Sequence, residues 1–221
     1  MVKIQRETTK NPITLIGKEA GICWNSNVSD KEKNYKRGVE CIKSNHGRTL
    51  EFPQVYLIID GYSARCIREL YTHIGGLPTR LQESTRYINY NDFSYIIPPS
   101  IEKNEQAKLE YKLLMTSIGN CYAKFLEYDI PKEDIANILP LGMTSKIVLR
   151  TNLRQLIDIM KVRQCTRAYW EIRELMKEIK LELSNYSEEW KELCNKYMPI
   201  KCDELGFCNE AHSCGRKEKY K

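Results

Sequence analysis

The chain has 221 residues, of which 42% are hydrophobic, and a formal net charge of +6 at pH 7. This hydrophobic content is sufficient for a packed core and excludes a mainly disordered chain. Residues 1–10 are polar, and no apolar run approaches the ~20 residues that cross a membrane. The nine cysteines are an odd count in a long chain, which argues against a secreted disulfide framework. We therefore expect a cytoplasmic protein without a membrane span.

The positive charge suits an anionic small molecule as well as nucleic acid. A nucleic-acid-binding protein usually carries a basic stripe on one helix face. Lys161, Arg163 and Arg167 come nearest to such a stripe, but Glu171 and Glu174 follow them. We therefore expect no nucleic-acid partner.

The first half of the chain predicts a mixture of strands and helices. The Ser29-Asp30-Lys31-Glu32 capping box predicts a helix that ends near Ser44, before Asn45-His46-Gly47. Ser63 can cap a second helix, which ends near Tyr71. The predicted strands cover residues 13–16, 54–60, 87–90 and 93–97, the last closed by Pro98 and Pro99.

The second half of the chain predicts mostly helices. A helix over 103–128 carries an apolar face formed by Leu114, Ile118, Cys121, Tyr122 and Phe125. The remaining elements are a short helix begun by 129–131, a strand over 144–151, and helices over 152–162 and 166–185. This order predicts an α+β fold, a single domain over 1–195 with helices around a mainly antiparallel sheet. Residues 196–221 form a basic, Cys-rich tail.

The segment 70–90, LYTHIGGLPTRLQESTRYINY, concentrates polar groups between two apolar stretches. Ser84 places a hydroxyl two residues before the Arg86 guanidinium, with acceptors at Gln82 and Glu83. Such groups can hold a phosphate while hydrogen-bonding the base of the same nucleotide. An ordinary solvated loop before a strand is the alternative.

Several short motifs along the chain, in order, match those of one enzyme family. Ser84-Thr85-Arg86-Tyr87 matches an S-x-R-Y ending, whereas Thr72-His73-Ile74 stands where an R-H-R triplet is expected. The later matches are Leu139-Pro140-Leu141, Asn152-Leu153-Arg154, Arg163 and Trp170-Glu171-Ile172. The chain thus resembles the flavin-dependent thymidylate synthases, with an altered triplet, and its fold is expected to be thymidylate synthase complementing protein-like.

The resemblance implies two groups of binding residues. The nucleotide would be held by Glu69, Thr72, Gln82, Glu83, Ser84, Thr85, Arg86, Lys146 and Arg163, partly from a neighbouring subunit. The flavin would contact Thr72, His73, Ile74, Asn152, Arg154 and Asp158, and Arg80 could supply the cation that the altered triplet lacks. Asp158 departs from the family, which commonly has an amide at that place.

Arg163 is the predicted catalytic residue. In the family the matching arginine contacts the uracil edge and favours a polarised ring deprotonated at N3. An arginine suits this role because it stays charged and presents a planar fork of donors. Without the resemblance, Arg163 is a cation at the end of a helix, where it complements the helix dipole.

Simpler readings remain for the other candidates. Glu69, Lys146 and Asp158 can be surface charges, and His73 can be a structural histidine. Gly75 and Gly76 permit either a turn or close backbone approach. No G-x-G-x-x-G pattern indicates a Rossmann flavin site.

The cysteines are not needed as nucleophiles, because reduced flavin supplies the hydride in the family. Cys165 lies close to Arg163 in the sequence and is expected to be a buried structural thiol. Cys202, Cys208, His212 and Cys214 could bind a metal or be redox-labile surface thiols, and their spacing differs from C-x2-C zinc ribbons. We assign no metal from the sequence.

The resemblance implies methylation of dUMP to dTMP by a homotetramer. The expected cofactors and cosubstrates are FAD, NADPH and methylenetetrahydrofolate. Two alternatives stay open: a paralogue that modifies another pyrimidine nucleotide, and a non-catalytic protein that binds nucleotides or nucleic acid.

Overall fold

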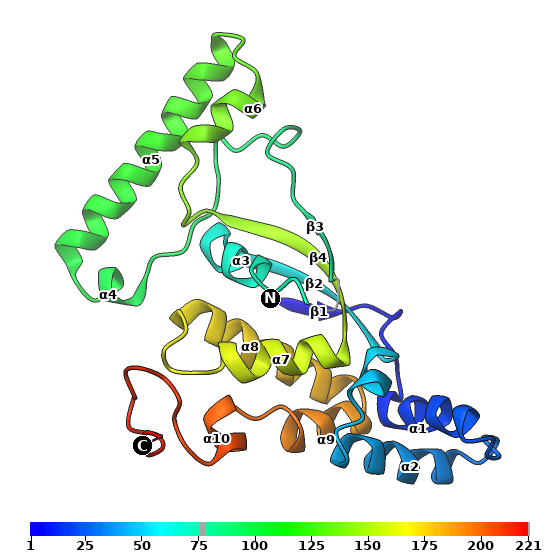
Figure 1. The fold of residues 1–221 in the computed structure, drawn as a ribbon. Helices are drawn as coiled ribbons and strands as arrows, with labels where there is room; N and C mark the ends of the chain where they lie inside the picture. The colour runs from blue at the N-terminus through cyan, green and yellow to red at the C-terminus, as the bar shows by residue number, and fades with distance from the viewer. Residues whose placement is uncertain (76–77, 221) are drawn as a thin grey trace. The chain divides into compact units, whose positions relative to one another are not determined.

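The computed structural model describes residues 1–75 and 78–220 and contains a four-stranded sheet (Figure 1). The strand order is β1-β2-β4-β3, where β1 is Val2–Ile4, β2 is Gln54–Ser63, β3 is Thr79–Gln82 and β4 is Thr144–Asn152. The ends of β2 and β4 pair antiparallel, because the Ala64 N–H donates to Met143 O (2.8 Å) and the Leu153 N–H donates to Pro53 O (3.0 Å). The predicted α+β class is confirmed.

The two long strands bury alternate residues. Val55, Leu57 and Ile59 on β2 and Ile147 and Leu149 on β4 are buried. Alternation places these side chains on one face of each strand, where they join the core. The predicted strands 54–60 and 144–151 are confirmed, each slightly shorter than the strand observed.

Helices account for most of the remaining chain. Their bounds are α1 Pro12–Cys23, α2 Lys31–Lys43, α3 Ala64–Tyr71, α4 Pro99–Glu102, α5 Glu105–Glu127, α6 Lys132–Ile135, α7 Leu153–Arg163, α8 Trp170–Tyr186, α9 Glu188–Lys196 and α10 Lys201–Leu205, with 3-10 turns η1 Gly47–Glu51 and η2 Ala136–Ile138. Asp30 caps α2 by accepting hydrogen bonds from the Glu32 and Lys33 N–H groups. Ser63 caps α3 by accepting from the Cys66 N–H (3.1 Å). No described helix is long and apolar enough to span a bilayer.

Three predicted strands are wrong. Residues 13–16 lie in α1, where Pro12 occupies the first turn and Ile13, Ile16 and Ala20 are buried at helical spacing. A four-residue window hid this period, which only the longer segment reveals. Residues 87–90 and 93–97 form turns and extended chain, with a single bridge between Tyr95 and Met143.

Two helices differ from their predicted form. The helix α5 exists, but its buried face is Met115, Gly119 and Tyr122, and Leu114 is exposed. The helix α8 begins at Trp170 rather than 166, because residues 165–168 form a turn in which the Ala168 N–H donates to Cys165 O.

The chain forms two compact units, each described by itself. The first contains residues 1, 59–71 and 81–147, and its core includes Tyr90, Tyr122 and Met143, with α4 and α6 against α5 (Figure 1). The second contains residues 2–58, 72–80 and 148–221, including α1, α2 and α7 to α10. The predicted boundary at 195/196 stays a prediction.

The α1–α2 hairpin of the second unit depends on two glycines. A Cβ on Gly17 would lie 1.8 Å from Asn34 O, and one on Gly38 would lie 2.0 Å from Ile13 O. The two backbones therefore approach more closely than any side chain allows. The Arg37 Nη1 closes the crossing by donating to Gly17 O (3.0 Å) and to Asn34 Oδ1 (2.9 Å).

Gly38→Ala should destabilise the protein by about 2 kcal/mol, because the added methyl group meets backbone and outweighs its gain in helix propensity. Urea denaturation followed by circular dichroism measures the change. Glu40→Ala on the exposed face of α2 is the matched control and should shift stability by less than about 0.5 kcal/mol. An unchanged midpoint for Gly38→Ala would contradict this account of the hairpin.

Candidate functional site

The predicted nucleotide residues of the first unit meet where β4 begins. The Glu83 N–H donates to Lys146 O (2.8 Å), and the Lys146 N–H donates to the Glu83 carboxylate (3.1 Å). The Gln82 Nε2 donates to Ser145 Oγ (3.2 Å). The structure thus brings Gln82, Glu83 and Lys146 together at one place, although they are distant in sequence.

The Lys146 ammonium also has a charge partner. Its Nζ lies 3.1 Å from Asp60 Oδ2, and this hydrogen bond raises the pKa of Lys146 above its ordinary value. The side chain is therefore a cation at neutral pH. It is held beside the loop in which Ser84 and Arg86 lie.

That loop is a turn whose arginine is paired. The Arg86 N–H donates to Ser84 Oγ (3.2 Å), and Thr85 lies half-buried within the turn. The Arg86 Nε donates to Glu133 Oε2 (2.8 Å), and both of these side chains are mostly exposed. Because an exposed ion pair contributes about 0–1 kcal/mol, an anionic ligand can compete with Glu133 for Arg86.

Glu69 belongs to the same unit and lies half-buried on α3. Its predicted role toward the base stays a prediction.

In the second unit, the predicted catalytic arginine contacts two residues of the altered triplet. The Arg163 Nε donates to His73 Nε2 (2.7 Å), and Nη2 donates to Thr72 Oγ1 (2.9 Å). In this contact His73 Nε2 is the acceptor, because a guanidinium N–H can only donate. The two bonds fix the plane of a guanidinium that stands at the last residue of α7. Sequence reasoning predicted these three residues but not their contact.

The opposite end of α7 borders a small cavity. Its volume is about 240 Å³, and its walls are Glu51, Gly75, Asn152, Arg154, Gln155 and Asp158. Asn152 caps the helix by accepting from the Gln155 N–H (2.8 Å), so its side-chain oxygen has a structural role. The Arg154 Nη1 donates to Glu51 Oε1 (2.7 Å). The three predicted flavin residues on this segment therefore share one cavity.

Two glycines lie close to side chains of the first turn of α7. A Cβ on Gly75 would lie 3.0 Å from Gln155 Oε1, and one on Gly47 would lie 3.2 Å from Arg154 Cζ. A glycine at position 75 therefore permits both a turn and the close approach of the Gln155 side chain. Gly76 lies outside the described residues.

The other triplet candidates are less clearly placed. Ile74 is 73% exposed. Arg80 lies on β3, half-buried, and its predicted role as a replacement cation stays a prediction. Sequence reasoning missed Glu51 and Gln155 as cavity residues. Gln155 lies about one helical turn after Asn152, so its place beside the predicted flavin residues could have been inferred from the sequence. Nothing near Glu51 in the sequence indicated a site.

Comparisons with known proteins identify the family to which the chain is similar. The thymidylate synthase complementing protein family matches residues 6–187. A flavin-dependent thymidylate synthase of Nitratidesulfovibrio vulgaris is 29% identical over 87% of this chain and 82% of its own length. One from Thermococcus onnurineus is 32% identical over 75% of this chain and 68% of its own length.

A solved structure shares the fold. The flavin-dependent thymidylate synthase of Helicobacter pylori, crystallised with FAD and dUMP, superposes with a TM-score of 0.67 at 17% identity, covering 86% of this chain and 98% of that one. The family match covers most of the chain. This protein belongs to the thymidylate synthase complementing protein family.

Proposed function

We propose that the protein converts dUMP to dTMP in the cytoplasm. Methylenetetrahydrofolate would donate the carbon, and NADPH would reduce FAD. Family membership and relatives named flavin-dependent thymidylate synthases support this function. The observation that carries it is the Arg163 guanidinium, held by His73 and Thr72 in a fixed plane.

The cavity beside Asn152, Arg154 and Asp158 is where we propose that part of FAD binds. Its volume of about 240 Å³ lies below the ~300–1,000 Å³ of ligand pockets, so it would accept only a portion of the cofactor. Arg154 fits a phosphate oxygen, and Asp158 fits a hydroxyl donor. When bound, FAD supplies the hydride that completes the methyl group.

For the nucleotide, we propose that Ser84 and Arg86 bind the phosphate. Arg86 would exchange Glu133 for a dianionic phosphate, and Lys146 would add a second cation nearby. Gln82 and Glu83 are held against β4, which limits the conformations available to the loop. Such pre-ordering lowers the entropic cost of binding.

Arg163 would act on the base. A planar guanidinium can donate to the uracil edge and stabilise the negative charge that develops on the ring. Two N–H groups of Arg163 donate to His73 and Thr72. The protein therefore sets the orientation of the guanidinium before the substrate binds. Preorganised donors stabilise a transition state more than donors that must reorient.

We also propose assembly into a homotetramer with shared sites. On α5, Leu109 (53% exposed) and Leu113 (61% exposed) stand one turn apart, on a face away from buried Met115 and Tyr122. These two leucines would form the apolar part of the proposed contact surface.

The experiment that tests the function is anaerobic turnover of dUMP with methylenetetrahydrofolate, NADPH and FAD. We expect dTMP and a yellow protein. Flavin binding with turnover of a different pyrimidine nucleotide would indicate the paralogue instead. A colourless protein without turnover would support the non-catalytic alternative.

Arg163→Lys should lower dUMP turnover by on the order of a hundredfold, because lysine keeps the charge but loses the planar fork. Affinity for dUMP should fall little, and NADPH should still reduce bound FAD. Steady-state kinetics, dUMP titration and anaerobic flavin bleaching separate the three effects. Wild-type turnover would leave only the helix-dipole role for Arg163.

Arg86→Ala should weaken dUMP binding by about 1.5–3 kcal/mol, the range for a hydrogen bond to a charged group. Glu133→Gln, which removes the competing carboxylate, is the matched variant and should bind dUMP at least as tightly as wild type. Isothermal titration calorimetry measures both. Equal affinities for wild type and Arg86→Ala would remove Arg86 from the phosphate site.

Leu113→Glu should dissociate the tetramer, because a charge in an apolar contact loses its hydration. Turnover should fall together with assembly across a dilution series followed by light scattering. Leu181→Glu, at a 57% exposed leucine on α8, is the control and should leave both unchanged. A fully active monomer would refute shared sites.

A further inference from the structure

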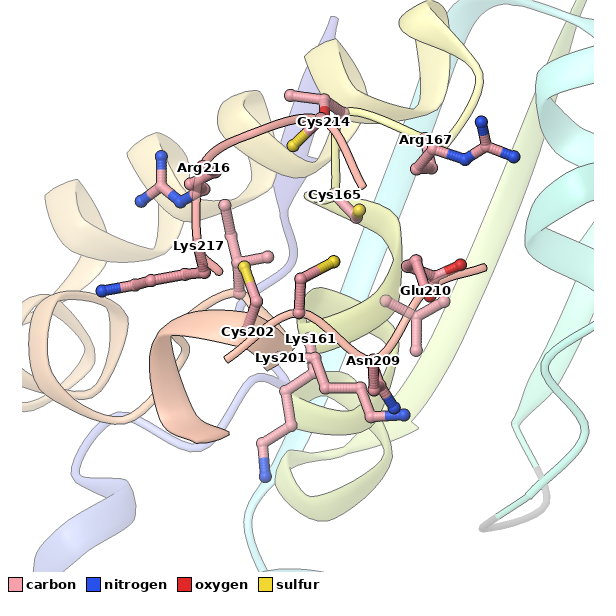
Figure 2. Close-up of a pocket in the computed structure, with 14 residues that line it drawn as sticks. Lys161, Cys165, Arg167, Lys201, Cys202, Asn209, Glu210, Cys214, Arg216 and Lys217 are labelled. Atoms are coloured by element: carbon pink, nitrogen blue, oxygen red, sulfur yellow. The ribbon is translucent and has the colours of Figure 1, made fainter. Parts of the chain in front are cut away.

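Four cysteine side chains from distant parts of the sequence line one pocket of the second unit (Figure 2). Cys165 follows α7, Cys202 lies on α10, and Cys208 and Cys214 lie in the tail. The pocket has a volume of about 160 Å³. His212, which the sequence grouped with the tail cysteines, is exposed and does not line it. Cys165 takes its place as the fourth soft donor.

Contacts within the pocket bring these thiols near one another. The Cys214 thiol hydrogen-bonds with Thr166, the residue after Cys165. Burial raises the pKa of the Cys202 thiol most, and Cys165 and Cys208 lie close enough for their charges to raise it further. All four are free thiols, and Figure 2 shows the sulfurs of Cys165 and Cys202 directed into the same space.

The tail has a defined shape without a core of its own. Between residues 204 and 220, all within the described chain, only Cys208 is buried. The tail folds back through two backbone bonds, Cys208 N–H to Glu218 O (2.7 Å) and Tyr220 N–H to Cys208 O (2.9 Å). Arg216 anchors it by donating to both carboxylate oxygens of Asp203. A metal ion or a disulfide is a common way to stabilise a segment with so few buried residues.

The surroundings suit a negatively charged cluster. Arg167, Lys201 and Lys217 line the pocket, together with Lys161 and Arg216. A divalent ion and its four thiolate ligands together carry a net charge of about −2. These cations would stabilise such a charge. Arg216 already pairs with Asp203 and Lys161 with Glu204, and Glu210 is the carboxylate among the described lining residues.

We propose that Cys165, Cys202, Cys208 and Cys214 bind one Zn²⁺ as a tetrahedral structural site. Each thiol releases its proton and each sulfur donates a lone pair, so no redox partner is needed. No three potential ligands of the described residues already surround a common point, so side-chain rotation and closure of the tail loop accompany binding. The ion would fix the tail to the turn that follows Arg163, at Cys165.

The test is metal analysis of protein purified without chelators. We expect about one zinc per chain by plasma mass spectrometry, and thiolate-to-cobalt charge-transfer absorption after exchange with Co²⁺. Cys165→Ser, Cys202→Ser, Cys208→Ser and Cys214→Ser should each weaken Co²⁺ binding by on the order of a hundredfold. Cys121→Ser and His212→Ala are the controls and should retain full affinity. Removing the ion should expose the tail beyond residue 206 to proteolysis.

Three results would overturn the site. The first is wild-type protein that neither contains zinc nor binds Co²⁺ through thiolates. The second is loss of metal in His212→Ala with retention in Cys165→Ser. The third is a pair of disulfides among these cysteines, detected as blocked alkylation under non-reducing conditions. Metal content and thiol counts do not depend on dUMP turnover, so this test stands apart from that of the proposed function.

Discussion

The contact between Arg163 and the pair His73 and Thr72 connects two segments that the sequence separates widely. One segment follows α3, and the other closes α7. A guanidinium at a helix end normally points into solvent, where its long side chain samples many rotamers. Here a ring nitrogen and a hydroxyl accept from two of its N–H groups, so the fork has one orientation. His73 Nε2 acts as the acceptor in this arrangement, because the guanidinium has only donors.

This contact gives the altered triplet a physical meaning. In place of a cation on each side of the histidine, the chain carries Thr72 and Ile74. Thr72 contributes an acceptor for Arg163, which a cation at that position would repel. The substitution therefore favours the observed orientation of the Arg163 guanidinium. Arg154 stands in the cavity at the other end of α7 and is the cation available there.

Sequence reasoning predicted the long strands and the capped helices because their signals are local. The Ser29-Asp30 pair marked the start of α2, although Asp30 rather than Ser29 is the cap, and Ser63 caps α3. Alternation in β2 is visible within a few residues. It failed at 13–16, where a short window cannot distinguish strand from helix, and at 87–97, where Tyr and Ile residues lie in loops rather than in strands. A high β-propensity means that a side chain fits a pleated sheet surface, and the neighbouring strands of the fold must provide that surface.

Most of the candidate residues could be named from the sequence, but their contacts could not. The motif matches identified Arg163, His73 and Arg86, yet neither the His73 contact nor the Glu133 pairing has a sequence signal. The four-thiol pocket shows the same limit, because Cys165 lies far from the tail in the chain and joins it only in the fold. Long-range contacts of single side chains are where a single sequence is least informative.

The central claim is that a fixed Arg163 guanidinium stabilises negative charge on the uracil ring. Its most direct test is the ionisation of bound dUMP, followed by ultraviolet difference spectroscopy across a pH titration. In wild type, bound dUMP should lose its N3 proton at a lower pH than free dUMP. The midpoint should return toward that of free dUMP in Arg163→Lys. An identical midpoint in both proteins would contradict the account.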